Sequence, residues 1–177
     1  DPRDYLAVLE YLFPALCREA GIEKEQIVGV GIDFTCCTIL PIKKDGTPLV
    51  SLPEFEKNKH AYVKLWKHHA AQPEADEITA LAAARSEEWL PIYGGKISSE
   101  WMFPKILEVL EHAPHVYEAA DRFIEAGDWI VWMLSGNEAR SASVSGFKSF
   151  WGEDGCYLTD DFLKELHPGL TGIIGTK

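Results

Sequence analysis

The apolar residues of this chain follow first a helical and then a strand-like spacing. Residues 4–20 repeat apolar side chains at helical intervals, which predicts a helix that ends at Gly21 and that allows a kink or a break at Pro14. The next stretch, "QIVGVGIDFT" at residues 26–35, is a short and nearly continuous apolar run. It predicts a buried strand with the polar Asp33 at its carboxyl end.

Extended and helical segments continue to alternate along the remaining sequence. The segment "CTILPI" stays extended and leads into a turn at Asp45-Gly46, and the stretch "RFIEA" predicts a second strand. The small polar stretch at residues 138–151 is predicted to be extended or a loop. Helices are predicted over residues 60–71, 73–85, 100–113, 127–135 and 159–166, with a further short turn opened by Pro114.

Particular residues set the expected helix boundaries. Pro73 suits the first turn of a helix, Ser98 and Ser99 can cap the helix that follows them, and Thr159 can cap the last helix. Gly136 ends the apolar helix before it. Strands and helices alternate, with more helices than strands, so the sequence predicts an α/β domain.

The composition limits the classes of partner. The 177 residues carry a formal net charge of −11, which repels phosphate backbones and anionic lipid heads, so neither nucleic acid nor a membrane is an expected partner. No apolar run approaches the roughly 20 residues of a membrane span. The cysteines, Cys17, Cys36, Cys37 and Cys156, include no CxxC pair, so no disulfide is expected and a reducing cytoplasm fits best.

The motifs for nucleotide and metal binding are incomplete. Gly29 and Gly31 lack the third glycine of a dinucleotide fingerprint, and the terminal "GIIGTK" lacks the residue order of a phosphate-binding P-loop. His68 and His69 are neighbours, and on a helix they would point about 100° apart rather than toward one ion. No metal site is therefore predicted.

Four positions are candidates for contact with a ligand, and each has a plainer alternative. Trp66 lies among lysines and histidines in "VKLWKHHAAQ", which suits a sugar but also fits a polar helix face. Lys148 also fits a surface lysine, and Glu100 fits a first-turn acid of a helix. Cys36 and Cys37 follow the end of a predicted strand, where α/β folds bind ligands and where small residues also pack. No Ser-His-Asp set is supported by spacing.

Five strings occur in an order that resembles a known family. They are "VGVGIDFTCCTILPI", "HAYVKLWKHHAAQ", "YGGKISSEWMFPKILEVL", "FIEAGDWIVWMLSG" and "SGFKSFW". Together they resemble the bacterial L-ribulokinases of the FGGY carbohydrate kinase family, over nearly the whole chain. The strings "LWKHHAAQ" and "GGKISSEWM" are specific to the ribulokinase-like members, whereas "DWIVWMLSG" is typical of the broader family.

The resemblance implies a fold and an activity for the whole protein. It implies an actin-like, ribonuclease H-like domain with helical insertions, of which residues 1–177 form part of the N-terminal, sugar-binding domain. It also implies ATP-dependent phosphorylation of L-ribulose to L-ribulose 5-phosphate in L-arabinose catabolism, with magnesium. The opening phosphate-loop strands, the catalytic aspartate and the C-terminal ATP lobe are expected outside this chain. No cofactor is expected on this segment, and the isolated chain is expected to be inactive.

The resemblance also implies roles for the four candidate residues. Trp66 matches the aromatic residue of the sugar pocket, and Lys148 matches the basic residue that reaches sugar hydroxyls. Cys36 matches a small residue after the strand, where close relatives place Ala or Ser, and Glu100 falls near a substrate-side position of other members. The alternatives are another FGGY kinase such as a xylulokinase, which "LWKHHAAQ" disfavours, or a non-catalytic binding domain. A homo-oligomer also remains open.

Overall fold

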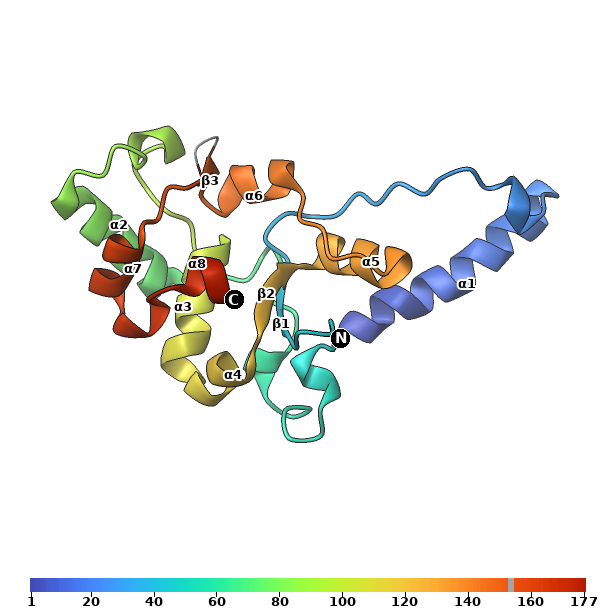
Figure 1. Cartoon of the computed structure of the whole chain (residues 1–177), viewed down its shortest axis with the longest axis horizontal. Helices are drawn as coiled ribbons and strands as arrows, with labels where there is room; N and C mark the ends of the chain where they lie inside the picture. The colour runs from blue at the N-terminus through green and yellow to red at the C-terminus, as the bar shows by residue number, and fades with distance from the viewer. Residues whose placement is uncertain (153–154) are drawn as a thin grey trace.

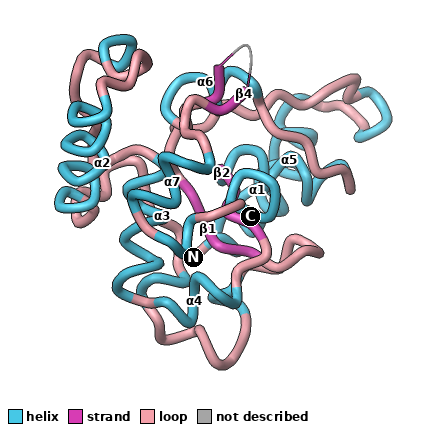
Figure 2. Tube along the Cα trace, turned by 60° about the vertical axis from the view of Figure 1, so that its left-hand side comes forward, coloured by secondary structure: helices cyan, strands magenta, loops and turns pink. Residues whose placement is uncertain are grey.

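A short antiparallel pair of strands lies at the centre of the molecule, with helices on both sides (Figures 1 and 2). The computed structural model describes residues 1–152 and 155–177. Strand β1 (Ile39–Ile42) pairs with strand β2 (Arg122–Glu125), with Ile39 opposite Glu125 and Ile42 opposite Arg122. A second, smaller hairpin joins β3 (Trp151–Gly152) to β4 (Gly155–Cys156).

Helices make up most of the remaining described structure (Figure 1). The α-helices are α1 (Pro2–Ala20), α2 (Gln72–Arg85), α3 (Met102–His112), α4 (Pro114–Ala119), α5 (Ala126–Ser135), α6 (Ala142–Lys148), α7 (Asp160–Leu166) and α8 (Ile173–Thr176). Short 3-10 helices cover Lys24–Gln26, Leu49–Ser51, Lys59–Ala61, Pro91–Tyr93 and Pro168–Leu170.

The central strands separate two apolar cores. Successive side chains of a strand point to opposite faces, and Ile39 and Phe123 accordingly enter the larger core, which helices α2, α3, α4 and α7 share. Leu40, Ile42 and Ile124 enter the smaller core, which is covered by α5 and the first turns of α1. Because both faces are covered, every residue of β1 is buried, which explains its nearly continuous apolar sequence.

Several local predictions are confirmed. Helix α1 ends at Gly21, whose φ is 65°, as predicted, but the break considered at Pro14 does not occur, because α1 continues from Pro2 to Ala20. Helix α5 ends at Gly136, with φ 74°, and the Thr159 hydroxyl accepts the backbone N–H of Phe162 at 3.2 Å to cap α7. Pro73 lies in the first turn of α2, as predicted. All four cysteines are free, as the absence of a CxxC pair led us to expect.

The predicted strand at residues 26–35 is wrong. Residues 27–35 pair with no other strand of the described chain; Ile27, Val28 and Val30 are exposed, Val28 fully, whereas Ile32 and Phe34 are half-buried against the smaller core. Figure 1 shows α1 and the segment after it projecting from the rest of the molecule. We refer to residues 1–35 as the arm. A continuous apolar run becomes a buried strand only when neighbouring strands cover it, and the described residues supply none.

The predicted helix at residues 60–71 is also wrong. Only Lys59–Ala61 form a 3-10 turn, and the chain then extends to lie beside β1. The N–H of Lys64 donates to the carbonyl of Ile39 at 2.8 Å, and the N–H of Ile39 donates back at 3.1 Å. These backbone bonds to a strand exclude the helical bonds that the local spacing favoured, so His68 and His69 do not lie on a helix.

The predicted loop at residues 138–151 contains helix α6 instead. The Ser141 hydroxyl accepts the N–H of Val144 at 3.4 Å and caps this helix. The small polar residues that suggested a loop therefore include a helix cap, which is a common use of serine.

The predicted caps of α3 are wrong. The N-cap position of α3 is Trp101, which makes no side-chain capping bond, and neither Ser98 nor Ser99 occupies it. The Ser98 hydroxyl instead accepts the N–H of Glu100 at 3.2 Å, in the turn before the helix. The helix was thus predicted correctly, but its start was placed too early.

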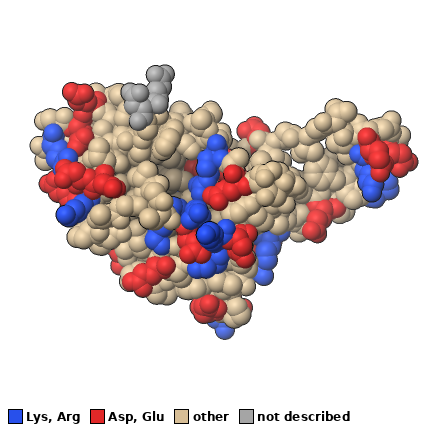
Figure 3. Space-filling view, viewed as in Figure 1, with Lys and Arg blue, Asp and Glu red and all other residues tan. Residues whose placement is uncertain are grey.

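The mixed α/β class is confirmed by the arrangement of the described elements. Both strand pairs of the described residues are antiparallel. Acidic and basic side chains lie next to one another over much of the visible face, including the far tip of the arm (Figure 3). None of the described helices combines the length and apolar content needed to cross a membrane.

Candidate functional site

Two loops from distant parts of the sequence meet beside the start of β1. One is the turn Cys36–Thr38, and the other is the segment after Lys64. The backbone N–H of Trp66 donates to the hydroxyl oxygen of Thr38 at 3.2 Å. The Trp66 side chain remains 47% exposed, so its ring stays accessible to a ligand next to the turn.

Lys105, on helix α3, joins these two loops. Its side chain is fully buried, and its Nζ donates to the carbonyl of Cys37 at 2.5 Å and to the carbonyl of Leu65 at 2.9 Å. Burial lowers the pKa of Lys105 to about 8. The negative charges of Glu125 and Glu100 act in the other direction and raise it, but they do not outweigh burial. The two carbonyl oxygens thus hold a lysine that would otherwise be unfavourable in the core.

The Cys37 backbone is held on its other side by Glu125, the last residue of β2. The N–H of Cys37 donates to Glu125 Oε1 at 2.9 Å. Burial raises the pKa of Glu125 to about 7, although this hydrogen bond opposes the rise. Cys37 has φ 64°, a left-handed conformation that is unusual for a residue with a side chain. Burial also raises the pKa of the Cys37 thiol to about 12, so this cysteine is a neutral thiol rather than a nucleophile.

A second buried cluster lies behind the Trp66 loop. Glu108 Oε2 accepts from Lys64 Nζ at 2.9 Å and lies 2.7 Å from His68 Nε2. Burial alone would raise the pKa of Glu108, but the hydrogen bonds from His68 and Lys64 outweigh it and lower the pKa to about 2. Burial and the charge of Lys64 lower the pKa of His60 to about 4. This cluster ties the backbone around Trp66 to α3.

Stability at acidic pH is expected to depend on Glu108. A carboxylate whose pKa falls from 4.5 to about 2 on folding stabilises the protein fully above pH 4.5 and loses this contribution as the pH falls toward 2. The substitution Glu108→Gln should remove that pH dependence. Urea unfolding of the 177-residue chain at pH 5, 4 and 3 measures this effect. Between pH 5 and pH 3, the unfolding free energy of the wild type should fall by more than about 1 kcal/mol beyond the fall seen in the variant.

The matched control for this experiment is Glu88→Gln. Glu88 is exposed, so its substitution should leave the pH dependence of the unfolding free energy as in the wild type. If the unfolding free energies of the wild type and Glu108→Gln change equally with pH across this range, the role given to Glu108 is wrong.

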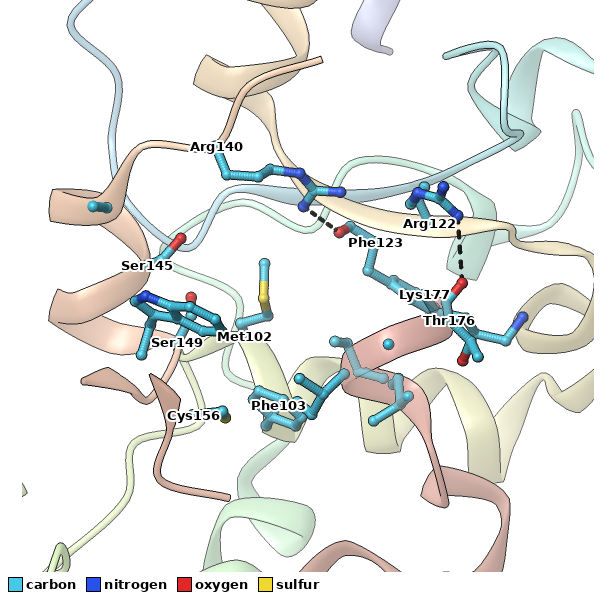
Figure 4. A pocket seen from close by; sticks show the side chains of 16 residues that line it. Met102, Phe103, Arg122, Phe123, Arg140, Ser145, Ser149, Cys156, Thr176 and Lys177 are labelled. Carbon is cyan, nitrogen blue, oxygen red and sulfur yellow. Dashed lines mark hydrogen bonds between the residues drawn. The ribbon is translucent and has the colours of Figure 1, made fainter. Parts of the chain in front are cut away.

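A separate pocket of about 530 Å³, partly walled by α6, contains none of the four candidate residues (Figure 4). Its walls include Met102 and Phe103 of α3 and residues 173–177. The Arg140 guanidinium at its rim donates to the carbonyl of Phe123 at 2.9 Å and to Glu138 at 3.0 Å. Because these charges are already paired and the walls are largely apolar, this pocket is less suited to a polyhydroxylated ligand than the Trp66 site.

Known proteins resemble this chain over nearly its whole length. No family model matches the chain. A protein named ribulokinase from Mycolicibacterium smegmatis is 51% identical over 176 residues, which cover 99% of this chain and 31% of that protein. The chain is thus similar to part of a ribulokinase. Ribulokinases of Bacillus licheniformis and Geobacillus thermodenitrificans are 47% and 45% identical over the same length. The chain spans about a third of the length of these relatives.

Two of the four candidate residues of this ribulokinase-like chain lie next to the backbone groups that Lys105 binds. Cys36 precedes Cys37 in the turn, and Trp66 follows the carbonyl that Lys105 binds. Glu100 Oε1 lies 3.7 Å from His69 Nε2, and its charge also acts on Lys105.

Lys148 is the last residue of α6 and is half-buried. Burial raises the pKa of the Cys37 thiol, and the positive charge of Lys148 opposes this rise, as expected of a group nearby. Its Nζ also lies 5.2 Å from the centre of the Phe147 ring. Cys36 and Trp66 thus lie on the two loops that Lys105 joins, whereas Lys148 and Glu100 are linked to this region only through the effects of their charges on Cys37 and Lys105.

Sequence reasoning missed the charged residues that hold this site together. Lys105 and Glu108 were treated only as part of the apolar stretch "FPKILEVL", and Glu125 only as part of a strand. The signal was present, since a lysine and a glutamate inside an otherwise apolar helix are seldom buried unless they are paired. Their partners lie 40 or more residues away, so the sequence alone does not reveal them.

One group of possible metal ligands lies elsewhere in the described structure. Glu74, Glu111 and His112 each offer a ligand atom, and these atoms lie within 4.8 Å of one another. His112 Nε2 lies 3.1 Å from Glu74 Oε1, so an ordinary hydrogen bond accounts for part of the arrangement. The histidines considered from the sequence behave differently, because His60 and His68 both approach Glu108.

Proposed function

We propose that the full-length protein is an FGGY-type sugar kinase, and that this chain contributes part of its sugar-binding side. The substrate would be L-ribulose, phosphorylated by Mg-ATP to L-ribulose 5-phosphate in L-arabinose catabolism, in the cytoplasm. The observation that carries the proposal is the 45–51% identity over 176 residues to proteins named ribulokinase. In this proposal the chain is part of the actin-like, ribonuclease H-like N-terminal domain of such a kinase.

The side chains around Cys37 offer the contacts that a small sugar needs. The exposed face of Trp66 can pack against the C–H surface of the sugar, as aromatic rings do in carbohydrate sites. Lys148 would donate a hydrogen bond to a hydroxyl, and Glu100 would accept one. Cys36, half-buried in the turn, would be a small residue beside the ligand. These roles remain proposals that the experiments below address.

The described residues do not fit an ATP site. Gly29 and Gly31 lie in the exposed, extended arm rather than at the start of a helix, and α8 is only four residues long. A phosphate cradle of the usual kind needs glycines that lead into a helix N-terminus. The contribution of this chain to phosphoryl transfer would therefore be to bind and orient the sugar, a role that can supply a large share of the rate enhancement.

The substitution Trp66→Ala in the full-length kinase tests the sugar site. We expect the Michaelis constant for L-ribulose to rise about fivefold, because the lost aromatic contact is worth about 1 kcal/mol. The Michaelis constant for ATP should stay within about twofold of the wild-type value, because the contact is made only to the sugar. Steady-state rates of ADP release at varied concentrations of each substrate measure both constants.

Trp151→Ala is the matched control for this substitution. Trp151 has nearly the same exposure, 48%, but lines the separate pocket. Its loss should leave both Michaelis constants near those of the wild type. If Trp66→Ala also behaves like the wild type toward L-ribulose, Trp66 is not part of the sugar site.

A further inference from the structure

Lys105 hydrogen-bonds to both loops of the candidate site, the turn at Cys37 and the loop at Leu65. It is fully buried on α3, and its two acceptors belong to segments that are 28 residues apart. An ammonium group buried in an apolar core is unfavourable unless it is fully hydrogen-bonded, so both carbonyls must stay close to it. The distance between the two loops is therefore fixed by one side chain.

The peptide group before Trp66 is held at both ends. Its carbonyl, from Leu65, accepts from Lys105 at 2.9 Å, and its N–H, from Trp66, donates to Thr38 at 3.2 Å. A peptide plane with both polar atoms bonded cannot rotate without losing one of them. Because this plane sets the direction of the next Cα–Cβ bond, it also sets the direction of the Trp66 side chain.

Both polar backbone atoms of Cys37, in the second loop of the site, are also hydrogen-bonded. Its N–H donates to Glu125 at 2.9 Å, and its carbonyl accepts from Lys105 at 2.5 Å. The left-handed conformation of Cys37, with φ 64°, is less stable than an ordinary one for a residue with a side chain. Such a conformation persists where surrounding bonds enforce it, and here Lys105 and Glu125 supply those bonds.

We propose that Lys105 is a positioning residue for sugar binding, which sets the Trp66 ring against the Cys36–Cys37 turn, with Glu125 holding the far side of the turn. This inference rests on the proposed sugar-binding role of Trp66. Lys105 itself, being fully buried, does not touch the sugar and acts only through the two backbone segments.

The first test compares Lys105→Met with the wild type in the full-length kinase. Methionine keeps most of the buried volume and removes the ammonium group. We expect the Michaelis constant for L-ribulose to rise about five- to tenfold, because a misplaced binding group weakens substrate positioning, while that for ATP stays within about twofold. A wild-type Michaelis constant for L-ribulose would overturn the proposal.

A control variant separates positioning from a general loss of stability. Trp129→Phe also removes a buried donor to a backbone carbonyl, because Trp129 Nε1 donates to Gly46 at 2.8 Å in the smaller core. This variant should lower the melting temperature and leave both Michaelis constants unchanged. If it raises the constant for L-ribulose as much as Lys105→Met does, the effect of Lys105 is general destabilisation and the proposal is wrong.

The double variant Lys105→Met/Trp66→Ala tests whether Lys105 acts through Trp66. If it does, the double variant should raise the Michaelis constant for L-ribulose by no more than about five- to tenfold. This is the increase expected for Lys105→Met alone, the larger of the two single effects. Independent effects would multiply to about 25- to 50-fold, and that result would overturn the proposal.

Thr38→Val keeps the test decisive if Lys105→Met does not fold. Valine has nearly the shape of threonine but cannot accept the N–H of Trp66, so we expect about a threefold higher Michaelis constant for L-ribulose. No change in Thr38→Val, together with a normal effect of Trp66→Ala, would overturn the positioning role and leave the sugar site standing. No effect of Trp66→Ala would instead overturn the proposed sugar site itself.

Discussion

Replacing Phe150 with alanine is expected to lower the free energy of unfolding by about 3–5 kcal/mol, the usual effect of removing a buried aromatic ring. Phe150 is fully buried. Its ring centre lies 4.9–5.8 Å from the ring centres of Trp89, Tyr93, Trp101 and Phe103. These neighbours come from two stretches of chain, residues 89–93 and 101–103, and their rings also pack against one another, so few of them can move to fill the space. Urea unfolding followed by circular dichroism measures the difference.

Phe147→Ala serves as the control for this substitution. Phe147 lies three residues earlier on α6 but is 62% exposed, so its loss should change the unfolding free energy by no more than about 0.5 kcal/mol. Equal effects of the two substitutions would show that the aromatic cluster around Phe150 does not form as described.

The substitution Lys148→Met in the full-length kinase is expected to lower kcat/KM for L-ribulose about 10- to 100-fold. A hydrogen bond from a charged donor to a hydroxyl contributes about 1.5–3 kcal/mol when it is shielded from water, and methionine cannot replace it. The Michaelis constant for ATP should change little. Melting curves of wild type and variant should nearly coincide, because the Lys148 side chain is only half-buried.

Lys164→Met is the matched control, since Lys164 is an exposed lysine on a different helix, α7. It should keep the wild-type kcat/KM for both substrates. If Lys148→Met also has wild-type kinetics, Lys148 is a surface lysine, which was the simpler reading of its sequence context.

Elements with strong local signals were predicted well from the sequence. Thr159 caps α7, Gly136 ends α5, and Pro73 opens α2, because each effect depends on the backbone within one turn of the residue. Strand β2 was also predicted, because its apolar run is short and lies between polar neighbours. These signals need no information from distant parts of the chain.

Two of the wrong elements, the strand at residues 26–35 and the helix at residues 60–71, failed because their structure depends on distant partners. The segment that contains Lys64 has helical spacing, yet its backbone hydrogen-bonds to Ile39, which is 25 residues away in the sequence. The apolar run at residues 26–35 has the composition of a buried strand, yet no described strand lies beside it. Local spacing reports what a segment favours alone, and tertiary pairing decides between alternatives of similar energy.

The candidate site divides in the same way. Trp66 and Lys148 were assigned by resemblance, and the backbone of Trp66 hydrogen-bonds to Thr38, the residue after Cys37. Lys105 and Glu125, which hold the backbone of the site, were not found from the sequence. Their importance lies in hydrogen bonds that cross 68 and 88 residues of chain, and no spacing rule reports such contacts.

The arm has a consequence for how the chain unfolds. Only the first turns of α1 pack on the smaller core, through Tyr5, Leu6 and Leu9, while Tyr11 and Leu16 further along the helix remain exposed. The later turns of α1 therefore depend on their own helical bonds, which are marginal over so few residues. Backbone amides there should exchange with solvent through local openings of low free energy, whereas those of β1 and β2 should exchange only through much larger openings. The later turns of α1 are thus expected to unfold separately from the rest of the protein. A single unfolding free energy describes the two cores and the first turns of α1 that pack on them.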